Sequence, residues 1–349
     1  MQLQAGQPPT KPEIIIFGPP SVFRLYAKQF SEKFRILKHW ESSIPLKEFL
    51  SIQAQHIQAA ICHAGFKVDS DILRFLPSLR LLLTTSAGLN HINLDDCRRS
   101  GVLVANSPTI FSVDVADLAV GLLMDVMRKI SAANRFVKSG NWAVKGGEYP
   151  LGTKLGGKRV GIVGLGSIGL EIAKRLEAFE CKISYLSRQK KSSVPYHFYN
   201  NVVELASHSN ILIICCALNE QTHHLINKEV LLALGKEGFI VNIARGAIID
   251  EKELVHCLQQ GIIAGAGLDV FENEPNVPKE LLELDNVVLS PHFAVFTEES
   301  FRDLFELLVG NLEAFFSNKP LITPVPNGCI CFCSIAIHPH HHLTPNLLP

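Results

Sequence analysis

The stretch "RVGIVGLGSIGLEIAKRL", residues 159–176, joins a buried strand to an amphipathic helix through three glycines. Gly164 permits the tight turn after the strand, Gly166 lets the backbone approach a pyrophosphate, and Gly169 lets helix and strand pack closely. Free amides and a partial positive charge at the start of the helix favour phosphate groups. A glycine triplet alone is weak evidence, but its position between strand and helix predicts a dinucleotide-binding turn. The residues expected to contact the dinucleotide are Gly164, Leu165, Gly166, Ser167, Ile168 and Gly169.

Short apolar runs alternate with helical patterns on both sides of this turn. Four runs precede it and resemble strands buried on both faces, at 13–18, 59–62, 79–86 and 101–106. Six runs form a second series, at 159–164, 182–187, 211–218, 238–244, 264–270 and 286–292. We expect helices over 114–130 and 298–316, and a polar loop over 138–157. Because strand–helix alternation is typical of parallel sheets, the sequence predicts an α/β fold whose second series forms one doubly wound nucleotide-binding domain.

A hydroxyl and positive charge follow the second strand of this series, where nucleotide-binding chains usually carry an acidic residue. In "KISYLSRQKK", residues 182–191, Ser187 and Arg188 lie 18 and 19 residues beyond Gly169. A carboxylate there would bind both ribose hydroxyls, whereas Arg188 can pair with a 2′-phosphate while Lys190 adds charge. The alternative is an ordinary solvated basic turn. We predict a 2′-phosphate pocket that prefers NADP(H) and binds NAD(H) more weakly, formed by Ser187, Arg188, Gln189 and Lys190.

The composition indicates a globular protein without a strongly charged partner. The 349 residues suffice for about two domains, and 47% of them are hydrophobic. Basic and acidic residues number 33 each, so no overall field attracts nucleic acid or an anionic membrane. The nine cysteines lack the spacing of a disulfide framework, and the N-terminus lacks a secretory pattern. We therefore expect a soluble, cytoplasmic protein with no nucleic-acid or membrane partner.

Polar side chains follow three further predicted strands, at the edge of a parallel sheet where ligands bind. "NIARGAIID" carries Arg245, "GLDVFENEP" carries Asp269 and Glu274, and "LSPHF" carries His292. Histidine suits proton transfer near neutral pH, a neighbouring carboxylate stabilises the imidazolium, and an arginine can clamp a carboxylate or keto oxygen. Each residue alone is also compatible with a structural role. Combined with a dinucleotide turn, the set predicts reduction of a carbonyl.

"GLGSIG", "NIARG", "GLDVFENEP" and "SPH", in this order and spacing, resemble the D-isomer-specific 2-hydroxyacid dehydrogenases. The resemblance covers about residues 13–326 and is greatest to the plant hydroxyphenylpyruvate, hydroxypyruvate and glyoxylate reductases. It implies that His292 is the acid–base residue, Glu274 its partner, and Arg245 the clamp for the carboxylate and keto oxygen. By the same resemblance, Asp269 would contact the nicotinamide carboxamide and Ile243 would lie along the cofactor.

The match of "TTSAGLNHI" implies that backbone amides near Ala87, Gly88 and Leu89 hold the substrate. The family also implies two Rossmann-like or flavodoxin-like doubly wound lobes with an active-site cleft between them. The substrate domain would comprise 1–109 and 296–326, and the NADP-binding domain 110–295. A homodimer is expected, with Trp142 of "GNW" reaching the neighbouring subunit's pocket. The implied reaction is NADPH-dependent reduction of glyoxylate, hydroxypyruvate or hydroxyphenylpyruvate to D-2-hydroxy acids.

The chain departs from the family pattern near the acid–base histidine and at its end. Bulky Phe293, Val295 and Phe296 stand where relatives carry small residues, and Val113 stands where an acidic residue is commoner. The tail 327–349 contains cysteines and histidines, but its CxCxC spacing is unusual for zinc, so we expect no metal. We regard the tail as an atypical appendage, which would also suit a variant product with a different last exon. A dinucleotide-sensing, corepressor-like or scaffold protein on the same fold is the alternative function.

Overall fold

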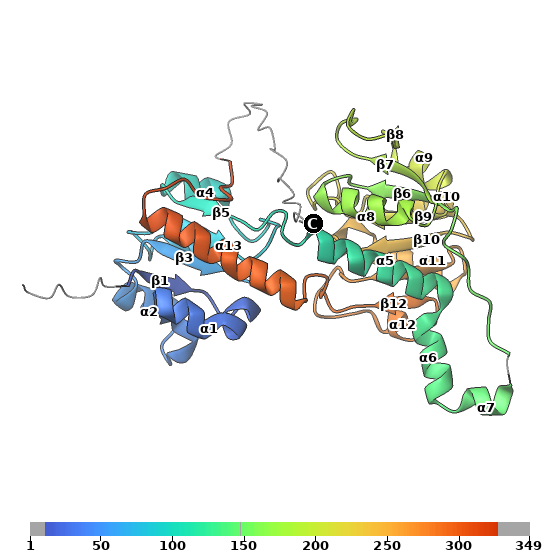
Figure 1. The fold of residues 1–349 in the computed structure, drawn as a ribbon, viewed down its shortest axis with the longest axis horizontal. Helices are drawn as coiled ribbons and strands as arrows, with labels where there is room; N and C mark the ends of the chain where they lie inside the picture. The colour runs from blue at the N-terminus through green and yellow to red at the C-terminus, as the bar shows by residue number, and fades with distance from the viewer. Residues whose placement is uncertain (1–10, 147, 327–349) are drawn as a thin grey trace, which may run out of the picture.

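The computed structural model describes residues 11–326 except Gly147. The predictions for the first ten residues and for the tail 327–349 lie outside these described residues. Two parallel α/β sheets make up the described chain, one built mainly from its first third and the other from its middle (Figure 1). The predicted fold class of two doubly wound parallel-sheet lobes is confirmed. Among residues 11–326, none of the helices combines the length and the apolar content needed to span a bilayer.

The first sheet has five parallel strands in the order β2-β1-β3-β4-β5, which is the flavodoxin-like order. Its strands are β1 (Glu13–Ile16), β2 (Arg35–Lys38), β3 (Ala59–Cys62), β4 (Leu81–Thr84) and β5 (Leu103–Ala105). Its connecting elements are α1 (Ser21–Lys33), η1 (His39–Glu41), α2 (Leu46–Gln53), α3 (Ser70–Leu73) and α4 (Leu94–Arg99). The central strands β3 and β4 are buried at every position because helices cover both faces.

The second sheet has seven parallel strands in the order β12-β11-β10-β9-β6-β7-β8, the Rossmann order extended by one strand. Its strands are β6 (Arg159–Val163), β7 (Lys182–Leu186), β8 (His197–Tyr199), β9 (Ile211–Ile214), β10 (Phe239–Asn242), β11 (Gly265–Leu268) and β12 (Val287–Leu289). Its helical elements are α5 (Ser112–Arg128), α8 (Ser167–Glu177), α9 (Val202–Ser207), α10 (Lys228–Leu234), η2 (Gly246–Ile248), α11 (Glu251–Gln259) and α12 (Lys279–Leu282). The apolar face of α5 packs on α8 and across β10–β12.

The last helix, α13 (Glu298–Phe316), follows the second sheet in the chain but lies against the first (Figure 1). Phe305 of α13 stacks on Tyr26 of α1, with ring centroids 4.7 Å apart. Thr323 then hydrogen-bonds through its hydroxyl to the carbonyl of Asn106 at 2.7 Å, beside β5. The chain therefore returns to its first lobe, although the division at 109/110 and 295/296 stays a prediction.

Three details of the sequence-based expectation were wrong. Strands β2 and β8 had been missed because both are short edge strands whose mixed polar and apolar residues are only partly buried. The expected loop over 138–157 contains the one-turn helix α7 (Asn141–Lys145), which begins after Gly140 in the left-handed conformation, with φ 75°. With α6 (Ile130–Lys138), this helix forms an arm that projects from the second lobe (Figure 1).

Candidate active site

The glycine turn has the shape that a pyrophosphate requires. A Cβ at Gly164, which has φ 101°, would lie 2.6 Å from the amide nitrogen of Cys216, and one at Gly169 would lie 2.4 Å from the carbonyl oxygen of Gly164. A Cβ at Gly166 would meet none of the described atoms within 4 Å, so this glycine faces open space. No side chain caps the first turn of α8, which leaves its amides available to an anion. These features fit a dinucleotide phosphate.

The basic turn lies beside the glycine turn because strands β6 and β7 are neighbours. The amide of Gly164 donates to the carbonyl of Leu186 at 2.8 Å, which brings Ser187 next to the glycine turn. The Ser187 hydroxyl donates to the carbonyl of Gln189 at 2.5 Å, so the turn closes on itself. Gln189 and the two basic side chains, Arg188 and Lys190, are exposed. The turn thus presents cations and no carboxylate where a ribose 2′ substituent would lie.

Arg245 follows β10 in a turn that Asn242 holds. The Oδ1 atom of Asn242 accepts from the amide of Ala244 at 3.0 Å, and its Nδ2 atom donates to the carbonyl of Arg245 at 3.0 Å. The guanidinium donates through Nη1 to the carbonyl of Ala244 at 2.6 Å. Burial lowers the pKa of Arg245, an effect that the charge of Glu274 opposes. Arginine nevertheless stays protonated, so the site holds a partly buried cation whose Nη2 atom donates to no acceptor among the described residues.

His292 and Glu274 form a hydrogen-bonded pair. The Nδ1 atom of His292 lies 2.7 Å from Oε2 of Glu274, which leaves Nε2 as the ring nitrogen available to a substrate. The other carboxylate oxygen accepts from the amide of Phe271 at 3.1 Å. Burial alone would raise the pKa of Glu274, but the hydrogen bonds from His292 and Phe271 and the charges of His292 and Arg245 lower it. Glu274 is therefore held as a carboxylate that faces Nδ1 of His292.

His292 has a left-handed backbone, with φ 58°, which is rare for a residue other than glycine. Asp269, a buried residue after β11, supports this conformation through hydrogen bonds. Its carbonyl accepts from the amide of His292 at 2.7 Å, and its carboxylate accepts from the amides of Phe293 at 2.9 Å and Ala294 at 3.1 Å. Sequence reasoning assigned Asp269 a cofactor contact, which stays a prediction. Its role as the anchor of the histidine segment was missed.

The proposed substrate loop presents free backbone amides. Within the described chain, the amides of Ala87, Gly88 and Leu89 donate to no protein acceptor. Two carbonyls of the loop instead accept hydrogen bonds from side chains. The Nδ2 atom of Asn106 donates to the carbonyl of Ala87 at 2.8 Å, and the Ser86 hydroxyl donates to the carbonyl of Gly88 at 3.0 Å. Sequence reasoning missed these two side chains. The only available signal was their position directly after buried strands.

The loop and the arginine meet across the two lobes. A Cβ at Gly88 would lie 2.6 Å from Nη2 of Arg245, and Asn90 Nδ2 donates to the carbonyl of Leu218 at 3.3 Å. The structure thus brings Arg245 against the loop at Gly88, and the charge of Arg245 acts on Glu274, the hydrogen-bonded partner of His292. Ile243 is buried just before Arg245. The predicted cleft between the lobes stays a prediction.

Other candidate residues lie at the margin of this centre or away from it. Phe293 and Phe296 stack with ring centroids 4.1 Å apart, and both are about half exposed. Val295 is partly buried, while Val113 and Trp142 are exposed, the latter on the arm.

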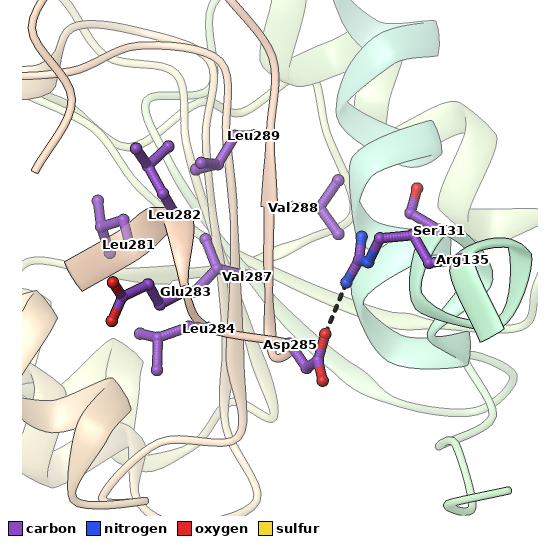
Figure 2. A pocket seen from close by; sticks show the side chains of 10 residues that line it. All are labelled: Ser131, Arg135, Leu281, Leu282, Glu283, Leu284, Asp285, Val287, Val288 and Leu289. Atoms are coloured by element: carbon purple, nitrogen blue, oxygen red, sulfur yellow. Dashed lines mark hydrogen bonds and ion pairs between the residues drawn. The ribbon is translucent and has the colours of Figure 1, made fainter. Parts of the chain in front are cut away.

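A separate cavity of about 360 Å³ lies between α6 and the segment from α12 to β12 (Figure 2). Arg135 and Asp285 bridge its rim with an ion pair at 2.6 Å (Figure 2).

One cluster of metal-ligand types occurs in the described residues. The ligand atoms of His223, His224 and Glu272 lie within 4.8 Å of one another. However, His224 Nε2 is already 2.8 Å from Glu272 Oε1, and the two imidazole rings stack with centroids 4.0 Å apart. Stacked rings direct their nitrogen lone pairs side by side rather than toward one point, so this geometry does not favour a shared ion. The expectation of no metal stays a prediction.

Comparison with known proteins defines the class of this fold and site. Residues 120–294 match the family model "D-isomer specific 2-hydroxyacid dehydrogenase, NAD binding domain". The chain is 49% identical to glyoxylate/hydroxypyruvate reductase HPR3 of Arabidopsis thaliana, over 92% of this chain and 98% of that protein. It is 46% identical to hydroxyphenylpyruvate reductase of Plectranthus scutellarioides, over 85% of this chain and 94% of that protein.

Solved structures agree with this result. A 2-hydroxyacid dehydrogenase from Ketogulonicigenium vulgare Y25 superposes with a TM-score of 0.85 at 35% identity, covering 91% of this chain and 99% of that one. An NADPH-dependent glyoxylate/hydroxypyruvate reductase from Sinorhizobium meliloti, in complex with NADP and malonate, has a TM-score of 0.83 at 33% identity, covering 90% and 97%. The chain belongs to the D-isomer-specific 2-hydroxyacid dehydrogenases. It is therefore an oxidoreductase that uses a nicotinamide dinucleotide, as the resemblance predicted.

Proposed function

We propose that this enzyme reduces small 2-oxo acids to D-2-hydroxy acids with NADPH, and that glyoxylate and hydroxypyruvate are its main substrates. Hydroxyphenylpyruvate is a further candidate. The observation that carries the proposal is that Arg245 lies against the loop at Gly88 and acts by its charge on Glu274, the hydrogen-bonded partner of His292. The names of the relatives from Arabidopsis thaliana and Plectranthus scutellarioides support this substrate class.

The roles of the residues follow from their positions. Arg245 and the amides of Ala87, Gly88 and Leu89 bind the substrate carboxylate, and the free edge of the guanidinium polarises the keto oxygen. When bound, the nicotinamide supplies the hydride to the keto carbon. The carbonyl electron pair moves to the oxygen, which takes the proton from Nε2 of His292, while Glu274 stabilises the imidazolium before transfer. Closure of the two lobes would exclude water from this step.

Replacement of His292 tests the proposed chemistry. His292→Ala should lower kcat by about 10²–10⁴-fold, because it removes the proton donor, and should leave NADPH binding unchanged. Turnover of glyoxylate and hydroxypyruvate gives the first readout, and NADPH fluorescence titration gives the second. His224→Ala is the matched control, since His224 is also a left-handed histidine, with φ 49°, bonded to a carboxylate at 2.8 Å. Near-normal turnover by the His292→Ala variant would show that His292 is not the proton donor.

The NADPH preference rests on the basic turn after β7. Arg188→Asp should raise the KM for NADPH about 10–100-fold, because it replaces a charge-assisted pair by repulsion, and should leave the KM for NADH unchanged or lower. Lys182→Asp makes the same charge change at the opposite end of β7 and controls for net charge. If the ratio of the two KM values does not move, the turn is not a 2′-phosphate pocket.

We also propose a homodimer and a catalytic rather than a sensing role. The exposed apolar side chains of the projecting arm support the dimer, Val144 and Trp142 among them. A corepressor-like or scaffold protein would need no turnover, although it could retain dinucleotide binding. A panel of glyoxylate, hydroxypyruvate and hydroxyphenylpyruvate, run with NADPH and with NADH, separates these roles and ranks the substrates.

A further inference from the structure

A chain of hydrogen bonds leads from His91 to the proposed substrate loop. The Nε2 atom of His91 lies 2.9 Å from the Thr84 hydroxyl, which lies 3.0 Å from the Ser86 hydroxyl. The Ser86 hydroxyl lies 3.0 Å from the carbonyl oxygen of Gly88. Thr84 ends β4 and is buried, so its hydroxyl has little access to water. The four groups therefore form a continuous path from an imidazole to the backbone of the loop.

The direction of this path follows from its last member. A carbonyl only accepts, so the single Ser86 proton goes to Gly88, and Ser86 must accept from Thr84. The Thr84 proton is then used, and Thr84 must accept from Nε2–H of His91. With the proton on Nδ1 instead, the Thr84 proton would go to Nε2 and the two hydroxyl oxygens would face each other without a hydrogen. Only the Nε2–H form of His91 satisfies all three hydrogen bonds.

We infer that His91 is a positioning residue for substrate binding: its Nε2–H bond to Thr84 holds, through Ser86, the Gly88 carbonyl turned away from the substrate. This assignment rests on the proposed function of the loop at Ala87, Gly88 and Leu89. With the Gly88 carbonyl tied back, the amide of Leu89 in the same peptide unit points the opposite way, toward the substrate carboxylate. Without it, the peptide can rotate and present an oxygen to an anion.

The surroundings of His91 keep it in a single, neutral state. Burial lowers the pKa of His91, and repulsion from the imidazolium form of His63 and from the charge of Arg245 lowers it further. His63 itself is partly buried, and burial lowers its pKa as well. At neutral pH the imidazole therefore carries one proton, and the bond to Thr84 determines that this proton resides on Nε2. Arg245, on the opposite lobe, remains the cation that attracts the carboxylate.

Three substitutions separate the hydrogen bond from packing. His91→Leu removes the donor, and His91→Gln can restore an N–H at the same reach. Ser86→Ala removes only the hydroxyl that donates to the Gly88 carbonyl. The measurement is the dissociation constant of oxamate, an unreactive analogue of a 2-oxo acid, with saturating NADPH, together with NADPH affinity and the thermal midpoint. We expect His91→Leu and Ser86→Ala each to weaken oxamate about five- to tenfold, the effect of losing one hydrogen bond, with NADPH affinity unchanged. His91→Gln should lie within about threefold of the wild type.

A double variant provides the sharpest outcome. If His91 acts through Ser86, His91→Leu combined with Ser86→Ala should bind oxamate no more weakly than either single variant. Additive losses, equal oxamate affinity in His91→Leu and wild type, or His91→Gln as weak as His91→Leu would each overturn the inference. Wild-type protein that fails to bind oxamate would instead contradict the proposed function. His56→Leu, a change of an exposed histidine outside this path, should match the wild type.

Discussion

At the scale of single residues, the site depends on two buried polar side chains that fix the backbone around His292 and Arg245. Asp269 supports a left-handed histidine with three hydrogen bonds, and Asn242 folds the turn that carries Arg245. Neither side chain needs to touch a substrate to be important. A residue in a sparsely populated backbone conformation costs roughly 1–3 kcal/mol, so His292 must be held by its neighbours.

Glu274 should make stability depend on pH in a defined direction. Because its pKa is lowered in the folded protein, the carboxylate stabilises the fold at neutral pH, and this contribution is lost as pH falls below the ordinary glutamate pKa of about 4.3. Glu274→Gln removes the titration, so its thermal midpoint should fall less than that of the wild type between neutral pH and pH values below that pKa. Glu32→Gln, on the exposed face of α1, should follow the wild type. Parallel curves for Glu274→Gln and wild type would contradict this explanation.

At the scale of elements, the proposed catalytic side chains are carried on turns after strands that pack very closely together. Gly246 begins the 3-10 turn η2 directly after Arg245, and a Cβ there would lie 1.8 Å from the carbonyl carbon of Phe271. The turns after β10 and β11 are therefore in backbone contact. This contact sets the distance between Arg245 and the segment that carries Glu274.

Gly246→Ala should destabilise the protein by about 1–3 kcal/mol or prevent folding, because the methyl group has no space and two backbones must separate. Gly121→Ala is the matched control, since Gly121 lies in α5 and a Cβ there meets nothing within 4 Å of the described structure. It should stabilise the helix by about 0.5–1 kcal/mol. Urea unfolding of both variants measures the difference. Equal stability of Gly246→Ala and the wild type would show that η2 tolerates the methyl group.

At the scale of the whole molecule, the chain crosses between its lobes twice and returns to the first. The two crossings are joined by a hydrogen bond of 2.5 Å from the Thr297 hydroxyl, at the start of α13, to the Asp114 carboxylate in α5. The proposed substrate loop follows a strand of the first sheet, and Arg245 follows a strand of the second. The site therefore exists only when both lobes are folded and face each other.

The projecting arm should determine the oligomeric state. Helix α6 buries none of its own residues, and Trp142 and Val144 are 61% and 84% exposed, which is unfavourable for apolar side chains in water. Val144→Asp should shift a dimer to monomer in light scattering after size exclusion, because a charge would enter the apolar contact. Ile52→Asp places the same charge on an exposed apolar position of α2 in the first lobe and should leave the dimer intact. A Val144→Asp protein of unchanged mass would exclude the arm as the interface.

Much of the architecture could be read from local pattern. Buried strands such as β3 and β9 are continuous apolar runs, and Gly164, Gly166 and Gly169 occur at the spacing that a strand–turn–helix requires. These signals depend on residues close together in the chain, so they can be recognised without knowledge of the fold. The edge strands β2 and β8 and the helix α7 were missed because short, partly exposed elements leave no such pattern.

The geometry of the site depended on contacts between residues far apart in the chain. The amides of Phe293 and Ala294 reach the Asp269 carboxylate across 24 and 25 residues of chain, and Gly88 reaches Arg245 only when the two lobes meet. Sequence pattern identified the candidate residues Arg245, Glu274 and His292, whose catalytic roles stay a prediction. Their distances, their protonation and the backbone of His292 follow from burial and from partners on other strands, which no local pattern encodes.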